Sequence, residues 1–187
     1  MIENRKFTEA DAQALLPDGP DEFYACAFTG MKFAGVHLES SQFYHCSFKN
    51  CSLAGQDITG SVFCETLFES CSLVGVNWAA VKRVSDLQFI ECKLDYSTFQ
   101  KLDLRRLQCR KCSIVDVDFS DANLLEAKFS DSVLAGANFS RSSLLKADFR
   151  SARSYFIDPQ YCKIKGAKFS LPEAAAIIIA LGAEVEL

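Results

Sequence analysis

The sequence has few histidines, no excess of basic residues and no long apolar run. Only His37 and His45 are available for histidine-based proton transfer or metal binding. The 24 acidic residues outnumber the 20 basic ones, which argues against a generally basic nucleic-acid-binding protein. No stretch reaches the ~18 consecutive apolar residues of a membrane span, and no apolar region of a secretory signal follows the N-terminus. We therefore expect one cytoplasmic domain without cofactor, membrane contact or direct nucleic-acid binding.

Large apolar residues recur at every fifth position over most of the chain. One series runs from Phe23 to Trp78, and after one additional residue a second series runs from Val84 to Phe149. The residue two places before each is usually small or apolar, with Gln56 and Lys82 as exceptions. A period of five fits neither the 3.6 of a helix nor the 2 of a strand. The pattern predicts a coil with flat sides.

Stacking every fourth repeat gives chemically uniform columns. If each repeat forms one side of a four-sided coil, about 20 residues complete a turn and equivalent positions stack at roughly 4.8 Å. The fold class is then an all-β quadrilateral β-helix of about seven coils followed by a C-terminal helix. The predicted core stack consists of Phe28, Phe48, Phe68, Phe89, Phe129 and Phe149.

Charges at the outward positions alternate in sign along each column. One column reads Asp86, Arg106, Glu126 and Lys146. Opposite charges on adjacent strands stabilise by ~0.2–1 kcal/mol per pair, so we interpret the basic stretch at 101–111 as largely neutralised.

Four acidic residues on two adjacent sides are candidates for partner binding. They are Asp95, Asp116, Asp118 and Asp121. Carboxylates along a rod can attract a basic surface of a partner protein. The alternative is that they are ordinary solubilising charges.

The nine cysteines do not follow a disulfide or metal-site pattern. Their number is odd, and seven of them occupy the small position two residues before a large apolar one. Cys109 and Cys112 form a C-x-x-C motif, but no second pair accompanies it, so we expect neither a zinc site nor redox chemistry. We interpret the cysteines as reduced, small packing residues. A filled coil also lacks the concave pocket of an enzyme, so no catalytic residue is predicted.

The chain divides into an N-terminal cap at 1–22, the β-helix at 23–169 and a C-terminal helix with its tail at 170–187. A short helix is expected at 8–16. Ser170 as N-cap, Pro172 in the first turn and Gly182 as a stop signal predict a second helix over 173–181. This helix is apolar on every side, so one side can cover the coil while another forms a homodimer. The predicted dimer interface is Ile177, Ile178, Ile179 and Leu181; a helix that only plugs the coil is the alternative.

The repeat units Ala122-Asn123-Leu124, Ala137-Asn138-Phe139 and Ala147-Asp148-Phe149 resemble those of the pentapeptide-repeat family. That resemblance implies a right-handed four-sided β-helix. The segments 155–159, 165–174 and 181–185 are similar to the C-terminus of Qnr-like members. This narrower resemblance implies dimerisation and binding of DNA gyrase or topoisomerase IV by DNA mimicry, which alters susceptibility to quinolones or to a gyrase toxin.

Qnr-like members carry loops between coils, whereas the repeat region of this sequence has only a one-residue break near Lys82. The resemblance therefore implies topoisomerase binding more strongly than protection from a drug. A rigid structural or interaction scaffold with an unrelated protein partner is the alternative function.

Overall fold

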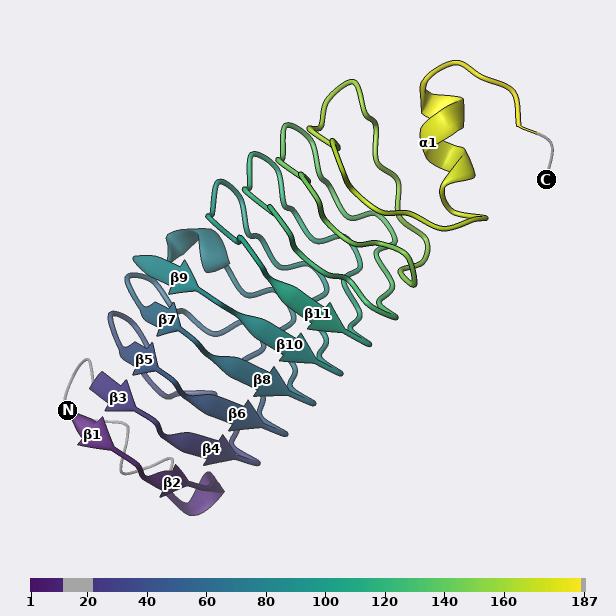
Figure 1. Ribbon diagram of the computed structural model, residues 1–187. Helices are drawn as coiled ribbons and strands as arrows, with labels where there is room; N and C mark the ends of the chain where they lie inside the picture. The colour runs from purple at the N-terminus through teal and green to yellow at the C-terminus, as the bar shows by residue number, and fades with distance from the viewer. Residues whose placement is uncertain (12–21, 186–187) are drawn as a thin grey trace.

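The computed structural model describes residues 1–11 and 22–185. The chain winds into a four-sided coil (Figure 1). Its strands form two parallel sheets, with the orders β1-β3-β5-β7-β9 and β2-β4-β6-β8-β10-β11. Their bounds are β1 Ile2–Glu3, β2 Lys6–Phe7, β3 Glu22–Tyr24, β4 Ala27–Thr29, β5 Gln42–Tyr44, β6 Ser47–Lys49, β7 Val62–Cys64, β8 Leu67–Glu69, β9 Arg83–Ser85, β10 Gln88–Ile90 and β11 Gln108–Arg110. The other labelled elements are a 3₁₀-helix, η2 (Trp78–Ala80), and an α-helix, α1 (Ala175–Ala180). Residues 9–11 also form a 3₁₀ turn.

The register confirms the predicted stacking of every fourth repeat. Phe28 pairs with Phe48, and Phe48 pairs with Phe68. After β11 the same column continues as isolated bridges from Gln108 through Lys128 and Asp148 to Lys168. The parallel β-helix predicted from the sequence is therefore confirmed.

A left-handed residue at each corner explains the period of five. The residue two places after nearly every central apolar residue has a positive φ, for example 48° at Asp86, 55° at Glu91 and 61° at Lys101, whereas Ala80 lies in η2 and has none. An extended segment followed by one left-handed residue turns the chain by one corner. The corner side chains point away from the core, which is why charged residues are found there.

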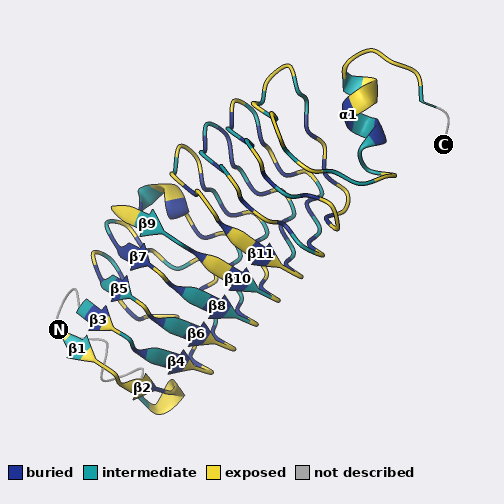
Figure 2. Cartoon of the chain, in the orientation of Figure 1, coloured by how far each residue is buried: buried dark blue, intermediate teal, exposed yellow. Residues whose placement is uncertain are grey.

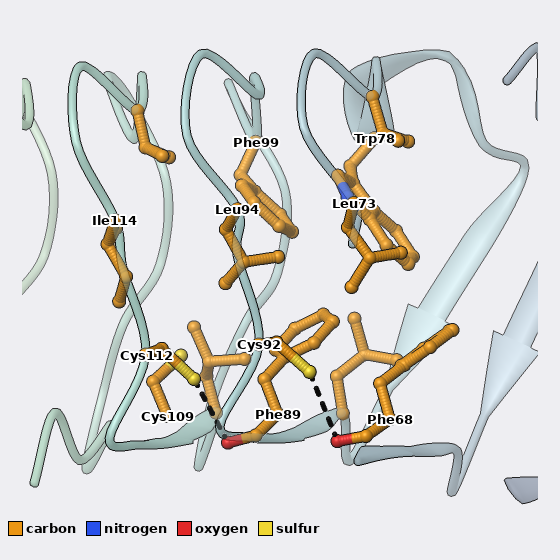
Figure 3. Packing of buried hydrophobic residues seen from close by; sticks show 14 of the residues in the cluster. Phe68, Leu73, Trp78, Phe89, Cys92, Leu94, Phe99, Cys109, Cys112 and Ile114 are labelled. Carbon is orange, nitrogen blue, oxygen red and sulfur yellow. Dashed lines mark hydrogen bonds between the residues drawn. The ribbon is translucent and has the colours of Figure 1, made fainter. Parts of the chain in front are cut away.

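The core is a set of stacked side chains in register. The ring centroids of Phe28 and Phe48 lie 4.6 Å apart, and those of Phe48 and Phe68 lie 4.8 Å apart. All six residues of the predicted stack are at most 1% exposed. Figure 2 shows that buried and exposed residues alternate along each coil, and Figure 3 shows Cys109 at the position that Phe89 holds one coil earlier.

The β-helix begins earlier than the sequence predicts. β1 pairs with β3 and β2 pairs with β4, so part of the predicted cap at 1–22 is itself a coil of the β-helix. The repeat is visible there only at Ile2 and Phe7, too short a series to detect alone. The predicted helix at 8–16 lies mostly outside the described residues.

The C-terminal helix is shorter than predicted, and Ser170 is not its N-cap. α1 starts at Ala175, and Ala174 before it makes no side-chain cap. The hydroxyl of Ser170 donates instead to the backbone carbonyl of Arg150 in the preceding coil. Among residues 1–11 and 22–185, no helix has the length and apolar character needed to cross a membrane.

Candidate protein-binding faces

One side of the coil carries acidic residues but no Lys or Arg on its strands; its one histidine, His37, lies 3.6 Å from Glu39. This side, here called the acidic face, is built on Leu38, Ile58, Trp78, Phe99, Phe119 and Phe139. The residues directly before and after these central positions include Glu39, Asp57 and Asp118 and no Lys or Arg. Asp116 lies at the corner that leads into this side. The acidic face is therefore defined by Glu39, Asp57, Asp116 and Asp118.

Asp118 is held in place by neutral donors. Its carboxylate accepts hydrogen bonds from the Ser120 backbone N–H at 2.9 Å, from Asn138 Nδ2 at 3.1 Å and from Gln100 Nε2. These donors fix the side chain without cancelling its charge, because no cation is among them. Asp118 therefore presents a fixed negative charge.

Asp57 is held by its own coil, and Asp116 is accommodated by the coil that follows. The Thr59 hydroxyl and backbone N–H lower the pKa of Asp57, and the N–H lies 2.8 Å from Asp57 Oδ1. A Cβ atom on Gly136 would collide with the Asp116 carboxylate, so the glycine leaves room for this carboxylate one coil earlier. Asp116 has no salt-bridge partner among the described residues.

Two of the four predicted acidic residues contribute less to the acidic face. Asp121 at the next corner forms an ion pair with Arg141, whose Nε and Nη2 each lie 2.7 Å from a carboxylate oxygen. Asp95 lies on the neighbouring side and accepts hydrogen bonds from Ser113 Oγ and the Val115 N–H. The structure thus places Asp116 and Asp118 two residues apart in one coil, while the carboxylate of Asp95 is engaged with the coil that contains Asp116.

Glu39 and Asp57 were not among the residues predicted for this face. The sequence marks this face only by an absence, because no Lys or Arg flanks any central residue of this column. Such an absence becomes visible only when the four columns are compared with one another.

Three further corner pairs have opposite charges in contact, as the alternating signs predict. Arg106 lies 2.9 Å from Asp86. Lys111 lies 3.7 Å from Glu91, and Lys146 lies 3.4 Å from Glu126. Exposed pairs of this kind contribute about 0–1 kcal/mol each, so their main effect is to neutralise these corners.

The small position two residues before each central residue has a second role that sequence reasoning missed. The thiol of Cys92 donates to the Phe68 carbonyl at 3.4 Å, and that of Cys112 donates to the Phe89 carbonyl at 3.4 Å (Figure 3). Ser61 Oγ donates to the Leu38 carbonyl in the same way. Cysteine at this position is therefore a hydrogen-bond donor between coils as well as a small packing residue.

The thiols and acidic residues do not form a metal-binding group in the described part of the chain. No three Cys, His, Asp or Glu side chains converge there. Burial raises the pKa of the Cys46 thiol to about 11. The neighbouring Cys112 thiol, together with burial, raises the pKa of Cys92 to about 12. These thiols stay protonated near neutral pH and lack the thiolate character of a nucleophile.

The C-terminal helix divides the predicted dimer residues into two sets. Ile177 is 7% exposed and belongs to the core cluster, so its prediction as an interface residue is wrong. It faces the coil because α1 covers the last repeats. Ile178, Ile179 and Leu181 are 44%, 56% and 62% exposed and remain available to a partner.

The fold and the register define a solenoid of tandem five-residue repeats. A family model described as a pentapeptide repeat region matches residues 21–99, and a second, described as pentapeptide repeats, matches residues 118–153. The chain belongs to the pentapeptide-repeat family.

Several solved structures are similar to the chain at low sequence identity. QnrB1, a plasmid-mediated fluoroquinolone resistance protein, is 18% identical with a TM-score of 0.38, and the match covers 99% of this chain and 98% of QnrB1. HetL from Nostoc sp. strain PCC 7120, involved in heterocyst differentiation regulation, is 15% identical with a TM-score of 0.36, covering 91% and 87%. A search of curated proteins finds no match to the sequence.

Proposed function

We propose that the chain is a non-enzymatic cytoplasmic binding protein that presents its acidic face to a basic surface of a partner protein. The observation that carries this proposal is the absence of Lys and Arg beside the central residues of one side, while other sides and corners carry both signs. A one-signed face on a rigid rod steers association with a surface of opposite charge and makes the association rate fall as salt rises.

The partner that fits this chemistry is a type II topoisomerase, DNA gyrase or topoisomerase IV. Such an enzyme must offer a basic surface to duplex DNA, and a rod with carboxylates along one side can occupy part of that surface. Fluoroquinolone resistance is the property stated for QnrB1. For this chain, altered quinolone susceptibility would be a consequence of topoisomerase binding.

The density of charge limits how closely the rod imitates DNA. Duplex DNA carries one negative charge per ~1.7 Å of its axis. The four acidic residues of the acidic face extend from the Leu38 coil to the Phe119 coil, and at ~4.8 Å per coil this is roughly one charge per 5 Å. We therefore infer that the rod engages a local basic patch rather than the whole DNA-binding surface.

The test is a gyrase supercoiling assay with purified protein titrated in, with and without a fluoroquinolone. We expect inhibition by the natural protein and weaker inhibition by the double variant Asp116→Asn/Asp118→Asn. The matched control is Glu91→Gln/Asp131→Asn, which removes the same charge at a different corner. Equal loss in both variants would show that only net charge matters and would overturn the assignment of the acidic face.

A scaffold with an unrelated protein partner is the second candidate. It is favoured by the paired corners and by the small net charge of −4, which distinguish the rod from a polyanion. No effect on gyrase or topoisomerase IV at micromolar protein, together with intact folding, would select the scaffold over the topoisomerase ligand.

We also propose that the protein dimerises through its C-terminal end. Exposed apolar side chains gather in this part of the sequence: Phe156, Tyr161, Leu171, Ile178, Ile179 and Leu181. Gln160 Nε2 lies 3.5 Å from the Ala180 carbonyl, which places the loop after Tyr155 beside α1. An isologous interface buries such a surface on two copies at once.

A further inference from the structure

The coil is open at one place along the side that contains β9. In the coil that follows, the Leu104 N–H donates to the Asn123 carbonyl and the Arg106 N–H to the Leu125 carbonyl, each at 2.8 Å. The repeat predicts the equivalent bonds from Val84 and Asp86 to residues 103 and 105. Among the described residues, however, no backbone hydrogen bond joins 82–86 to 102–106. We call this gap the seam.

The seam is confined to one side. At its far end the Gln108 N–H donates to the Leu87 carbonyl at 3.2 Å, and β10 pairs with β11 in register. Arg106 also reaches across to Asp86 at the corner. The two coils therefore stay joined while their strand edges separate between these points.

The sequence explains why the coils separate here. Arg83 pairs with Val62, but the backbone N–H that donates to the Ser61 carbonyl is that of Lys82. The additional residue therefore forms a bulge at the start of β9. The position that holds buried Ser61 one coil earlier is held by Lys82 and then by Leu102. The ammonium group of Lys82 cannot enter the core unpaired, so this side chain is exposed. Leu102 is only half-buried, so neither residue fills the inward position that Ser61 fills one coil earlier.

A polar hollow of about 670 Å³ lies over the seam. Two cations of its lining are already paired: Arg105 with Asp103 at 2.7 Å and Arg106 with Asp86 at 2.9 Å. Three further cations line it without a salt-bridge partner among residues 1–11 and 22–185: Lys82, Arg83 and Lys101. The hollow therefore favours an anionic occupant.

We propose that the seam binds an extended acidic segment of a partner protein by strand addition. The segment pairs its backbone with the edge of β9, and its carboxylates reach Lys82, Arg83 and Lys101. An exposed strand edge supplies main-chain hydrogen bonds to an added strand, and the side chains beside it select the sequence. A peptide fits better than a nucleic acid because no aromatic side chain lines the hollow to stack on a base.

This inference is independent of the proposed function. The seam lies on a different side of the coil from the acidic face and has the opposite charge. Failure of topoisomerase binding would leave it unchanged.

The test uses the full-length protein and a fluorescein-labelled short peptide of alternating Glu and Val. We expect saturable binding by fluorescence anisotropy, weakened by salt, with protection from hydrogen exchange at the amides of Val84, Asp86 and Asp103. The double variant Arg83→Glu/Lys101→Glu should bind at least tenfold more weakly. The matched control Lys93→Glu/Lys128→Glu, which changes the charge equally on other sides, should change the affinity less than twofold.

Three further probes separate backbone pairing from simple charge attraction. A Lys-Val peptide should not bind, and a Glu-Val peptide with alternate amides N-methylated should bind at least tenfold more weakly. Undiminished binding of the methylated peptide, equal losses in both double variants, or tighter binding of a short single-stranded oligonucleotide would each overturn the proposal. So would the absence of amide protection at saturating Glu-Val peptide.

Discussion

Arg141 lies one coil after Asp121 and donates two hydrogen bonds of 2.7 Å to it, one to each carboxylate oxygen. The hydrogen bonds from Arg141 hold the pKa of Asp121 below its usual value. This pair marks one edge of the acidic face, because beyond it the corner is neutralised. The negative charge of Asp121 is thus balanced by Arg141 before a partner reaches it.

Replacing Arg141 with Gln should leave the Asp121 carboxylate without its cationic partner. We expect the pKa of Asp121 to rise towards the ordinary Asp value, because the hydrogen bonds that favour the carboxylate are lost. Carboxyl-carbon NMR during a pH titration measures this shift directly. We also expect the variant to inhibit gyrase more strongly than the natural protein, because the acidic face gains a charge. An unchanged Asp121 pKa in the variant would contradict the ion pair.

Cys46 should make stability fall in alkaline solution. Burial raises its pKa from 9.0 to about 11, so above pH 9 the unfolded thiol releases its proton before the folded one does. The free energy of unfolding therefore holds below pH 9 and falls as the pH rises towards 11, by about 1–2 kcal/mol for this thiol. Urea unfolding at pH 8 and pH 10.5 measures the loss.

Cys46→Ser is the matched variant for that measurement. Serine already serves as the inter-coil donor at Ser61 and does not titrate in this range. The difference in unfolding free energy between the natural protein and Cys46→Ser should shrink or reverse from pH 8 to pH 10.5. A pH-independent difference would show that the Cys46 thiol titrates equally in both states.

The spacing of apolar residues is sufficient to predict the coil and its core, but not its irregular places. Phe48 and Phe68 belong to one series in the sequence and stack in the structure, because the same five-residue unit fixes both the corner and the register. The seam depends instead on two residues twenty positions apart. Lys82 is visible as an exception, but its effect follows only when Leu102 occupies the same position in the next coil. The pairing of Asp121 was visible in the alternating charges, whereas the start of the coil at Ile2 was not.

The exposed and buried residues of α1 should respond differently to substitution. Ile178→Asp should give monomers by light scattering with little change in unfolding free energy, because Ile178 is 44% exposed. Ile177→Ala should leave the oligomeric state unchanged and destabilise by roughly 2 kcal/mol, since it removes core packing. Dimers that persist in Ile178→Asp would place the interface elsewhere.

Phe68 tests the aromatic stack itself. Its ring lies between those of Phe48 and Phe89, at centroid distances of 4.8 and 5.2 Å, and it is 0% exposed. Phe68→Ala should lower the free energy of unfolding by about 3–5 kcal/mol, because it removes packing on both sides and leaves a cavity that a rigid coil cannot close. Phe156→Ala is the control, since Phe156 is 63% exposed and should cost about 0.5 kcal/mol or less. Equal effects in urea unfolding would mean that the solenoid is not stabilised by its central column. A large effect at Phe68 alone would show that this ring, stacked on Phe48 and on Phe89, is a main contributor to the stability of the solenoid.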